Sequence, residues 1–386
     1  MVKKAVNAIF VGGIVLLLLA GLARTALFPK EVNAYENRYA EKISPLTLKG
    51  WLDGSFQDSV DKALADQVQL AQVYKRAYNF TSSRYLKAAA DPLLPLCRGR
   101  YVNYVDTLLF DGYIAYPPRV LADMTERLAA KADNYNEYFS AHPQLDFYVY
   151  YIEKDTDINF ETGEKIPACQ YLFDRLDLPR DRLGKFAVDS FDQFSGWFYR
   201  TDHHWNLDGS YLAYTRLLDL LGVEDALLTP AGEARTLGTF SGSKASGAAA
   251  AFEEPFSAYP FDFPDMEVTV NGIPGSYGNQ EGFFAGTGGE PSYGGFYGWD
   301  AGEVTFSTGR ADRENLLILG ESYDNAVVRL LSTHFNRTYA VDLRYYEAYM
   351  GEPFSFSDYV EAHGITQVLL IGNIDYYLMD EFRLEG

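Results

Sequence analysis

The chain has 386 residues, of which 47% are apolar and 22% charged, so it is long enough for a sizeable core and too apolar to be disordered. Its 33 Lys and Arg against 53 Asp and Glu give a net charge of −20, which argues against a nucleic-acid partner, because binding phosphate needs a basic face. The only two cysteines, Cys97 and Cys169, exclude a disulfide-dense scaffold or a zinc ribbon. They are either one disulfide of an oxidising compartment or two small buried side chains.

The N-terminus holds an uncharged apolar stretch at residues 5–23. As a helix it would span about 28 Å, close to the thickness of a hydrocarbon core. Lys3 and Lys4 precede it and favour an N-inside orientation, which exports everything that follows. We therefore expect residues 1–24 to be a single-pass membrane anchor with an extracytoplasmic domain after it. The alternative is a signal peptide, whose cleavage would leave a secreted protein.

Residues 25–50 read as a juxtamembrane linker, and residues 51–386 as one large domain. A first helical stretch is predicted at 51–90, where apolar side chains recur at helical spacing, and a second at 118–140. Buried strands follow at 145–152 and 185–188, and a further helix at 208–221.

The stretch at 238–302 changes character, with 14 glycines in 65 residues. It predicts an insertion of loops and short strands, either as flexible binding loops or as a solvated β-extension. Its best strands are 267–273 and the adjoining 303–308.

Regular alternation begins after the insertion. Helices at 323–334 and 356–363 separate three buried strands at 315–320, 338–343 and 366–373. This order indicates βαβ units in a mostly parallel sheet, covered by helices on both faces.

Ser322 lies directly between a predicted strand and a predicted helix. Active residues of open α/β sheets lie at the carboxyl ends of strands, which also singles out Arg344 and Asn373. A hydroxyl beside free backbone amides, those of Ser322 and Tyr323, is suited to acyl transfer, because the amides stabilise an oxyanion. The alternative is that Ser322 only caps the helix.

Of the five histidines, only His203 and His204 adjoin a carboxylate in a segment with no other evident role. In an extended segment Asp202 and His204 would share one face, about 6.5–7 Å apart at Cα, with His203 on the other. Asp202 would then orient His204 as a general base for Ser322. Alternatives are a structural histidine pair, or a metal site of Asp202, His203 and His204 that lacks further ligands at recognisable spacing.

Two motifs together resemble a known family: DHHWNLDG at 202–209 and GESYDNA at 320–326. They are similar to those of the bacterial DHHW proteins, which resemble alginate O-acetyltransferases and SGNH hydrolases. The resemblance extends to ENR at 36–38, DLRYY at 342–346 and GN at 372–373, but not to the glycine-rich stretch.

The resemblance implies an SGNH-hydrolase-like three-layer sandwich over residues 51–386, with the glycine-rich stretch inserted. Carried over residue by residue, Asp202 is the orienting acid, His204 the general base and Ser322 the nucleophile. The sequence departs from the pattern at Glu321, where the family has Asp, which puts the hydrogen bonds of that turn in question.

Five further residues are candidate oxyanion or substrate contacts. The amide of Tyr323 and the side chain of Asn373 are candidate oxyanion donors, although Asn373 equally suits a helix cap. Arg344 is suited to an anionic group on a glycan, or to an ion pair with a neighbouring carboxylate such as Asp342. Trp205 suits either packing or stacking on a sugar, and His203 lies beside the base.

We therefore expect an extracytoplasmic O-acetyltransferase or esterase that acts on a cell-envelope or exported polysaccharide, without a cofactor or metal. The resemblance favours transfer, with a membrane-bound O-acyltransferase as the partner that supplies the acyl group. The alternative is a glycan-binding or assembly protein without chemistry. Catalysis requires Asp202, His204 and Ser322 to be linked by a chain of hydrogen bonds of about 2.6–3.2 Å, whereas binding does not.

Overall fold

The computed structural model describes residues 38–67, 98–104, 107–247 and 252–384, together with scattered positions before residue 38. Within this part of the chain, no helix combines the length and apolarity that crossing a bilayer requires. Most of the predicted span at 5–23 lies outside the described residues, as does Cys97, so the anchor and the disulfide stay predictions. Cys169 is buried and has no disulfide partner among the described residues.

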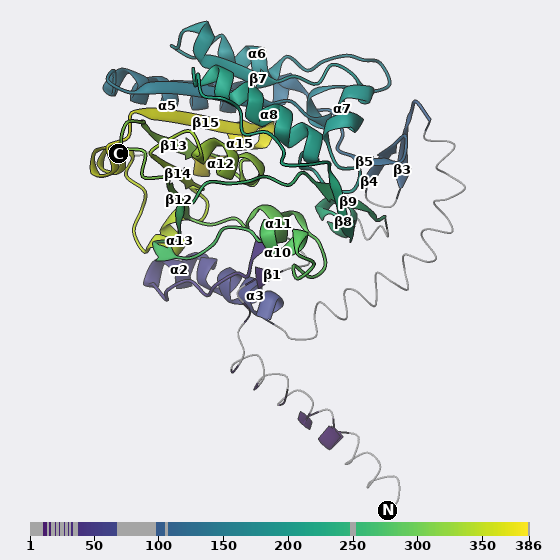
Figure 1. Ribbon diagram of the computed structural model, residues 1–386. Helices are drawn as coiled ribbons and strands as arrows, with labels where there is room; N and C mark the ends of the chain where they lie inside the picture. Colours follow the sequence, from purple (N-terminus) through teal and green to yellow (C-terminus); the bar gives the residue numbers. More distant parts are fainter. Residues whose placement is uncertain are drawn as a thin grey trace, which may run out of the picture.

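An eight-stranded mixed sheet forms the centre of the molecule (Figure 1). Four of its seven strand pairings are parallel and three are antiparallel, so the expected parallel sheet is found in five neighbouring strands and is extended by antiparallel ones. In spatial order the strands are β11 (Ile273–Pro274), β10 (Glu267–Val270), β12 (Glu303–Ser307), β14 (Arg337–Val341), β13 (Asn315–Leu319), β15 (Gln367–Asn373), β6 (Asp146–Ile152) and β7 (Leu183–Phe186).

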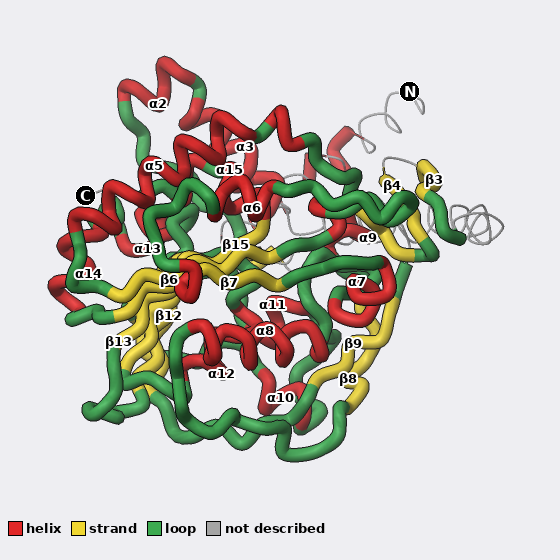
Figure 2. The backbone as a smooth tube through the Cα atoms, turned by 90° about the horizontal axis from the view of Figure 1, so that it is seen from above, coloured by secondary structure: helices red, strands yellow, loops and turns green. Residues whose placement is uncertain are grey.

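Helices cover both faces of the sheet and make the predicted three layers (Figure 2). On one face lie α5 (Thr125–Ala141), α6 (Ala168–Phe173), α13 (Tyr346–Met350), α14 (Phe356–His363) and α15 (Ile374–Leu378). On the other lie α7 (Phe191–Trp197), α8 (Leu207–Leu220) and α12 (Asn325–Ser332).

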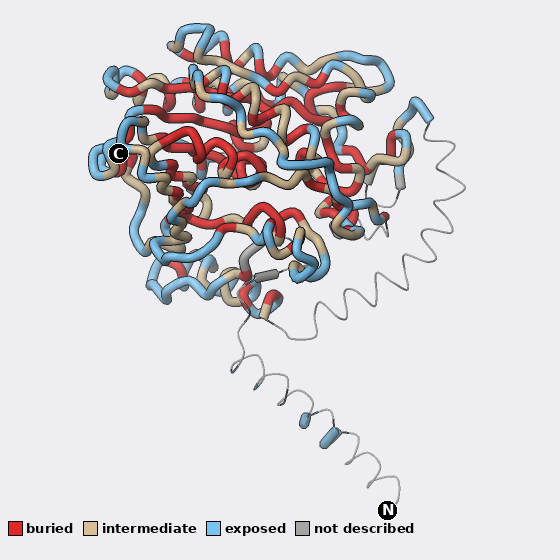
Figure 3. The backbone as a smooth tube through the Cα atoms, viewed as in Figure 1, coloured by how far each residue is buried: buried red, intermediate tan, exposed pale blue. Residues whose placement is uncertain are grey.

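A separate hydrophobic core lies on each face of the sheet, and the central strands are buried on both sides (Figure 3). In β6, Phe147, Val149 and Tyr151 pack toward the α5 face, and the alternate residues Tyr150 and Ile152 pack toward the α8 face. Each large side chain buried in this way contributes about 1.5–3 kcal/mol of transfer free energy. This double burial produces the unbroken apolar runs seen in the sequence.

The glycine-rich segment, which the sequence predicts as loops and short strands rather than helices, contributes two strands to the main sheet and also contains short helices. The predicted strand at 267–273 is two short strands, β10 and β11, joined at Asn271 and Gly272 with φ of 52° and 73°. The segment also forms a two-stranded ribbon and three short helices: β8 (Arg235–Phe240), β9 (Glu254–Ala258), α9 (Ser243–Gly247), α10 (Gln280–Phe284) and α11 (Tyr293–Tyr297).

N-terminal to the sheet, two helices separated by Gly54 (φ 85°) confirm the first part of the helical stretch predicted at 51–90. Residues 68–90 lie outside the described residues. Lys42, which precedes them, lies with Nζ 4.4 Å from the ring centre of Tyr349 in α13. The remaining elements are β1 (Val32–Asn33), β2 (Arg38–Tyr39), α2 (Leu48–Asp53), α3 (Ser55–Gln67), β3 (Tyr101–Tyr104), β4 (Thr107–Phe110) and β5 (Tyr113–Ala115).

The helix predicted at 118–140 begins only at Thr125, after a single 3-10 turn at Leu121–Asp123. The N–H of Arg119 donates to the carbonyl of Thr156 at 2.9 Å, which ties the residues after the two prolines to the neighbouring loop. The predicted start at the prolines is therefore wrong.

Candidate active site

Ser322 lies in a tight turn at the carboxyl end of β13. The strand ends at Leu319 and α12 begins at Asn325, so five residues make the reversal. A Cβ on Gly320 would lie 2.3 Å from Oδ2 of Asp324 and 3.0 Å from Cγ2 of Ile371, so a larger residue here would displace the Asp324 side chain beside the nucleophile. The Ser322 side chain remains half-buried and reachable from outside.

Asp202, His204 and Ser322 form one hydrogen-bonded chain. Nδ1 of His204 lies 2.6 Å from Oδ1 of Asp202, and Nε2 lies 2.8 Å from Oγ of Ser322. Asp202 and His204 are both buried, and each is 2% exposed. The bond to Asp202 directs the other ring nitrogen toward the hydroxyl, which is the arrangement a general base needs.

The carboxylate of Asp202 is held by several donors. The backbone N–H of His204 donates to Oδ1 at 3.0 Å, and that of Ser243 donates to Oδ2 at 2.7 Å. Burial by itself would raise the pKa of Asp202, but the adjacent His204, His203 and these bonds outweigh it and lower the pKa. The group is therefore an anion that stabilises a protonated His204.

His203 does not point away from His204, as an extended segment would require. The two ring centres are 3.9 Å apart, because the chain bends where Asp202 accepts the N–H of His204. Nδ1 of His203 lies 2.6 Å from Oγ of Ser243, and burial lowers the pKa of His203 well below its usual value. The predicted orientation of His203 is therefore wrong, and its ring is neutral.

Tyr293, from the glycine-rich segment, is part of the site and was not predicted. Its ring lies parallel to His204, with 3.7 Å between the centres and 6° between the planes. Its hydroxyl donates to the carbonyl of Ser322 at 2.9 Å. One side chain thus holds both the imidazole and the nucleophile turn. Neither Tyr293 nor Ser243 carries a sequence signal, since each is one of many similar residues in an irregular stretch.

The turn also presents backbone donors. Among the described residues, no acceptor receives the N–H of Ser322 or of Tyr323, whereas the N–H of Asp324 donates to the carbonyl of Glu321. The N-cap residue of α12 is Asp324 and not Ser322, so the interpretation of Ser322 as a helix cap is wrong. Two free amides beside the hydroxyl are suited to stabilising an oxyanion.

Asn373 takes the second of its two predicted roles. Its side-chain oxygen caps α15 by accepting the N–H of Asp375 at 2.8 Å. Its amide group donates to Glu321, which is buried, and burial raises the pKa of that carboxyl. Glu321 is therefore accommodated in the turn by Asn373.

Arg344 and Trp205 are both engaged inside the protein. Arg344 forms an ion pair with Asp342 at 2.5 Å and a longer one with Asp300 at 3.4 Å, as in the ion-pair alternative. Trp205 is completely buried and packs against Phe186. It therefore has no exposed face for a sugar, and the stacking interpretation of Trp205 is wrong.

Asp202, His203 and His204 are also the group of described residues whose ligand atoms come close enough for a metal, all within 4.8 Å. Their atoms are already engaged, however. Both ring nitrogens of His204 and Nδ1 of His203 have side-chain partners, and Ser243 donates to Asp202. A metal would have to break these bonds, so the donor set fits a proton relay better than an ion.

Comparison with known proteins supports the fold assignment. A DHHW family protein from Eubacterium siraeum superimposes with a TM-score of 0.56 at 17% identity, covering 74% of this chain and 98% of that one. PatB1 of Bacillus cereus, with a sulfonyl adduct, gives 0.55 at 18% identity, and a second PatB1 structure gives 0.51 at 16%; each covers 74% of this chain and 100% of PatB1. The predicted DHHW-like fold is confirmed. No protein-family model matches the sequence, and no curated protein does.

Proposed function

We propose that this protein is a serine-dependent O-acetyltransferase or esterase of a cell-envelope or exported polysaccharide. The observation that carries the proposal is the continuous chain from Asp202 through His204 to Ser322, with links of 2.6 and 2.8 Å. His204 and Ser322, which are 118 positions apart in the sequence, converge in hydrogen-bonding geometry, which a purely structural histidine does not require.

In the first half-reaction Oγ of Ser322 attacks the carbonyl carbon of an acetyl donor while its proton passes to Nε2 of His204. The carbonyl oxygen becomes an oxyanion that the amides of Ser322 and Tyr323 stabilise, typically by about 3–4 kcal/mol for each donor. The intermediate then expels the donor's alcohol or thiol, which takes the proton from His204, and an acetyl-serine remains.

In the second half-reaction a sugar hydroxyl gives its proton to His204 and attacks the acetyl-serine. The second tetrahedral intermediate collapses to the sugar ester, and the proton on His204 returns to Ser322. Water in place of the sugar would make the protein an esterase. The resemblance to the DHHW and alginate O-acetyltransferase group supports transfer.

The proposal places the domain outside the cytoplasmic membrane, with a membrane-bound O-acyltransferase as the source of the acyl group. Support comes from the apolar stretch at 5–23 and from the sequence resemblance. A periplasmic or cell-surface reporter fused after residue 386 is expected to be active in the bacterium. A reporter that is active only in the cytoplasm would remove this part of the proposal.

The chemistry is tested by covalent labelling of the full chain. Incubation with p-nitrophenyl acetate, or with an arylsulfonyl fluoride, is expected to add one acyl or sulfonyl group at Ser322, located by peptide mass spectrometry. The sulfonyl adduct in the PatB1 structure supports the choice of the second reagent. Ser322→Ala is expected to remain unlabelled.

The matched control is Ser257→Ala, since among the described residues the Ser257 hydroxyl bonds only to Thr236 on the neighbouring strand β8, and labelling is expected to continue. A wild-type chain without an adduct at Ser322, or with equal labelling after Ser322→Ala, would contradict the serine mechanism. Activity that disappears on treatment with a chelator would favour the metal alternative instead.

A further inference from the structure

Exposed apolar side chains are concentrated in one short part of the domain, residues 43–64. Among the described residues after residue 37, ten large apolar or aromatic side chains are exposed, and six of these lie in that part. The six are Ile43, Leu46, Leu48, Trp51, Leu52 and Leu64. Soluble domains seldom expose apolar side chains in a group, and such a group marks a contact surface.

Helix α2 turns its large apolar side chains outward. Leu48, Trp51 and Leu52 lie at positions i, i+3 and i+4, so they share one face of the helix. They are 78%, 56% and 76% exposed, whereas the buried residue beside them is Gly50, which has no side chain to pack. Burying a side chain as large as leucine contributes about 1.5–3 kcal/mol. This face would therefore be stabilised by contact with another apolar surface.

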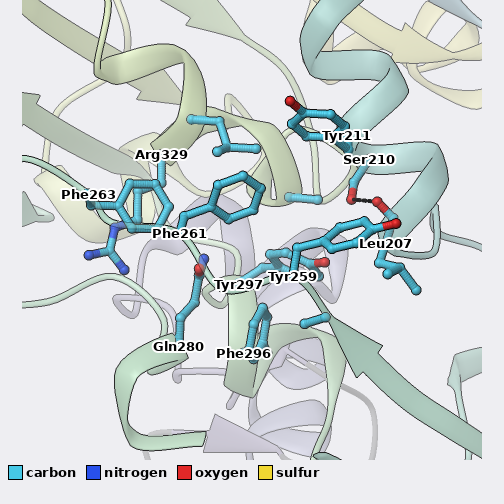
Figure 4. A pocket seen from close by; sticks show the side chains of 13 residues that line it. Leu207, Ser210, Tyr211, Tyr259, Phe261, Phe263, Gln280, Phe296, Tyr297 and Arg329 are labelled. Carbon is cyan, nitrogen blue, oxygen red and sulfur yellow. Dashed lines mark hydrogen bonds between the residues drawn. The ribbon is translucent and has the colours of Figure 1, made fainter. Parts of the chain in front are cut away.

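Aromatic side chains elsewhere in the domain fill the spaces that they line. Tyr211, Phe261 and Tyr297 line the space between α8, α12 and the glycine-rich segment (Figure 4). About 20 Å³ of this space is open to the centre of a water molecule, which is room for one or two waters. The domain thus packs its aromatic side chains closely, and the outward face of α2 is an exception to that packing.

The chain connects α2 and α3 to the apolar stretch at 5–23. The N–H of Lys30 donates to Oε1 of Gln67 at 2.7 Å, and Nε2 of Gln67 donates to the carbonyl of Lys30 at 2.8 Å. Lys30 is therefore fixed at the end of α3. It follows Ala23 by seven residues, which reach at most about 25 Å. If the apolar stretch spans the bilayer, the end of α3 lies within this distance of the membrane surface.

The charges beside the exposed apolar side chains suit a phospholipid surface. Residues 42–52 contain Lys42 and Lys49 and no acidic residue, in a chain whose net charge is −20. Both lysines are exposed, although Nζ of Lys42 also lies over the ring of Tyr349. Leucine and tryptophan with flanking lysines are typical of segments at the boundary between acyl chains and headgroups, where anionic lipid attracts the lysines.

We propose that the surface formed by Ile43, Leu46, Leu48, Trp51 and Leu52 lies against the lipid bilayer. Trp51 would lie at the level between the headgroups and the acyl chains. Because α2 and α3 lie together at one end of the domain, lipid contact there would fix the orientation of the whole domain on the membrane (Figure 1). The inference rests on the proposed membrane anchor and not on the serine chemistry.

The test measures contact between Trp51 and lipid in the full chain. The chain is reconstituted in vesicles of phosphatidylcholine and phosphatidylglycerol, with or without bromine on the upper part of the acyl chains, because bromine quenches tryptophan on contact. Of the four tryptophans, Trp51 is exposed, Trp205 is completely buried, and Trp197 and Trp299 are half-buried. The emission of Trp51, measured as the difference between the wild type and Trp51→Phe, is expected to fall at least about twofold in brominated lipid.

Trp197→Phe is the matched control for the loss of a tryptophan. Trp197 packs against Phe186 in the domain core, with 5.2 Å between the ring centres. Brominated lipid is expected to lower the emission of this variant by the same amount as that of the wild type.

A second variant separates lipid contact from the anchor. The double substitution Leu48→Glu and Leu52→Glu places two carboxylates on the exposed face of α2. It is expected to abolish the quenching of Trp51, while the chain still sediments with the vesicles. Ile273→Glu, at an exposed position of β11, is the control and is expected to leave the quenching unchanged. All variants are expected to be labelled at Ser322 like the wild type, so a failure of the serine chemistry is detected separately.

Three results would overturn the inference. Unquenched Trp51 in a chain that sediments with the vesicles, or quenching that the double variant retains, would leave the anchor in place and remove the lipid contact. A chain that stays in the supernatant would remove the anchor and the lipid contact together. A dimer in detergent that the double variant dissociates, with Trp51 unquenched in vesicles, would assign this surface to a second copy of the chain.

Discussion

The parallel half of the sheet and the glycine-rich segment contribute different things to the same site. Ser322 follows β13 and His204 precedes α8, so the groups that would exchange the proton belong to the regular α/β framework. Ser243 and Tyr293, which fix the acid and the imidazole, come from the irregular segment. The comparison indicates that the framework determines which atoms react, and that the segment determines how closely they stay aligned. Substitutions on each side can test this division.

The largest effect is expected on the framework side. Ser322→Ala removes the attacking oxygen, and we expect at least a thousandfold loss of kcat for ester hydrolysis. The free energy of unfolding is expected to fall by only about 1 kcal/mol, because the substitution removes one hydrogen bond, that between the half-buried hydroxyl and Nε2 of His204. Assays of p-nitrophenol release measure kcat, and urea denaturation measures the free energy of unfolding. An unchanged kcat would contradict the assignment of the reacting groups to the regular framework.

Asp202→Asn is expected to have the next largest effect, about a hundredfold to a thousandfold in kcat. The uncharged amide no longer stabilises a protonated His204, and it favours the wrong tautomer of the imidazole. Asparagine has nearly the same volume as aspartate, so we expect the fold to be retained. A circular dichroism melt accompanies the kinetics, and a collapse of thermal stability with the loss of activity would indicate a structural aspartate.

A smaller effect is expected on the other side of the comparison. Tyr293→Leu removes the ring that lies on His204, and we expect about a tenfold to a hundredfold loss of kcat, because the imidazole is no longer fixed in orientation. Tyr293→Phe keeps the ring and loses the hydroxyl bond to the carbonyl of Ser322, worth about 1 kcal/mol, and the longer one to that of Tyr323, so at most about a tenfold loss is expected. Tyr293 is thus a positioning residue.

The two tyrosine variants also distinguish positioning from general packing. Loosened alignment lowers kcat and leaves KM for a small ester nearly unchanged, whereas a disordered pocket raises KM as well. If Phe and Leu at this position are equally damaging, the stacking argument is wrong and the hydroxyl alone matters.

The last prediction concerns the stability of the framework, and not the rate, and how that stability depends on pH. Asp157 is buried beneath Tyr151, and burial raises its pKa to about 6. The unfolded carboxyl loses its proton near pH 4, so between about pH 4 and 6 the folded state binds more protons. The free energy of unfolding therefore falls by about 3 kcal/mol as pH rises through this window. Above about pH 6 the contribution of Asp157 no longer changes with pH.

Asp157→Asn cannot ionise and is expected to lose that slope. Urea denaturation of both proteins at pH 4, 5, 6 and 7 measures how the free energy of unfolding of each changes with pH. The contributions of the other carboxyl groups cancel when the two proteins are compared. Identical slopes in the two proteins would contradict the pKa assigned to Asp157.

The framework was predictable because its strands are buried on both faces and its helices are regular, and both properties leave patterns in the sequence. The motif at 202–209 and the strand-to-helix turn at Ser322 also followed from local order and from the family resemblance. The orientation of His203 did not follow, because it depends on a bend made by one side-chain bond of Asp202. Tyr293 did not follow either, because stacking on His204 is a tertiary contact between residues 89 positions apart that no local periodicity encodes.

The outer strand β11 has a consequence for the molecule in solution. It is two residues long and ends in Pro274, which has no N–H to donate. An edge this short, with a donor removed, offers a foreign strand almost no ladder to continue, so this border of the sheet is protected against strand-by-strand aggregation. The aromatic-rich chain can therefore be concentrated without this edge seeding fibres.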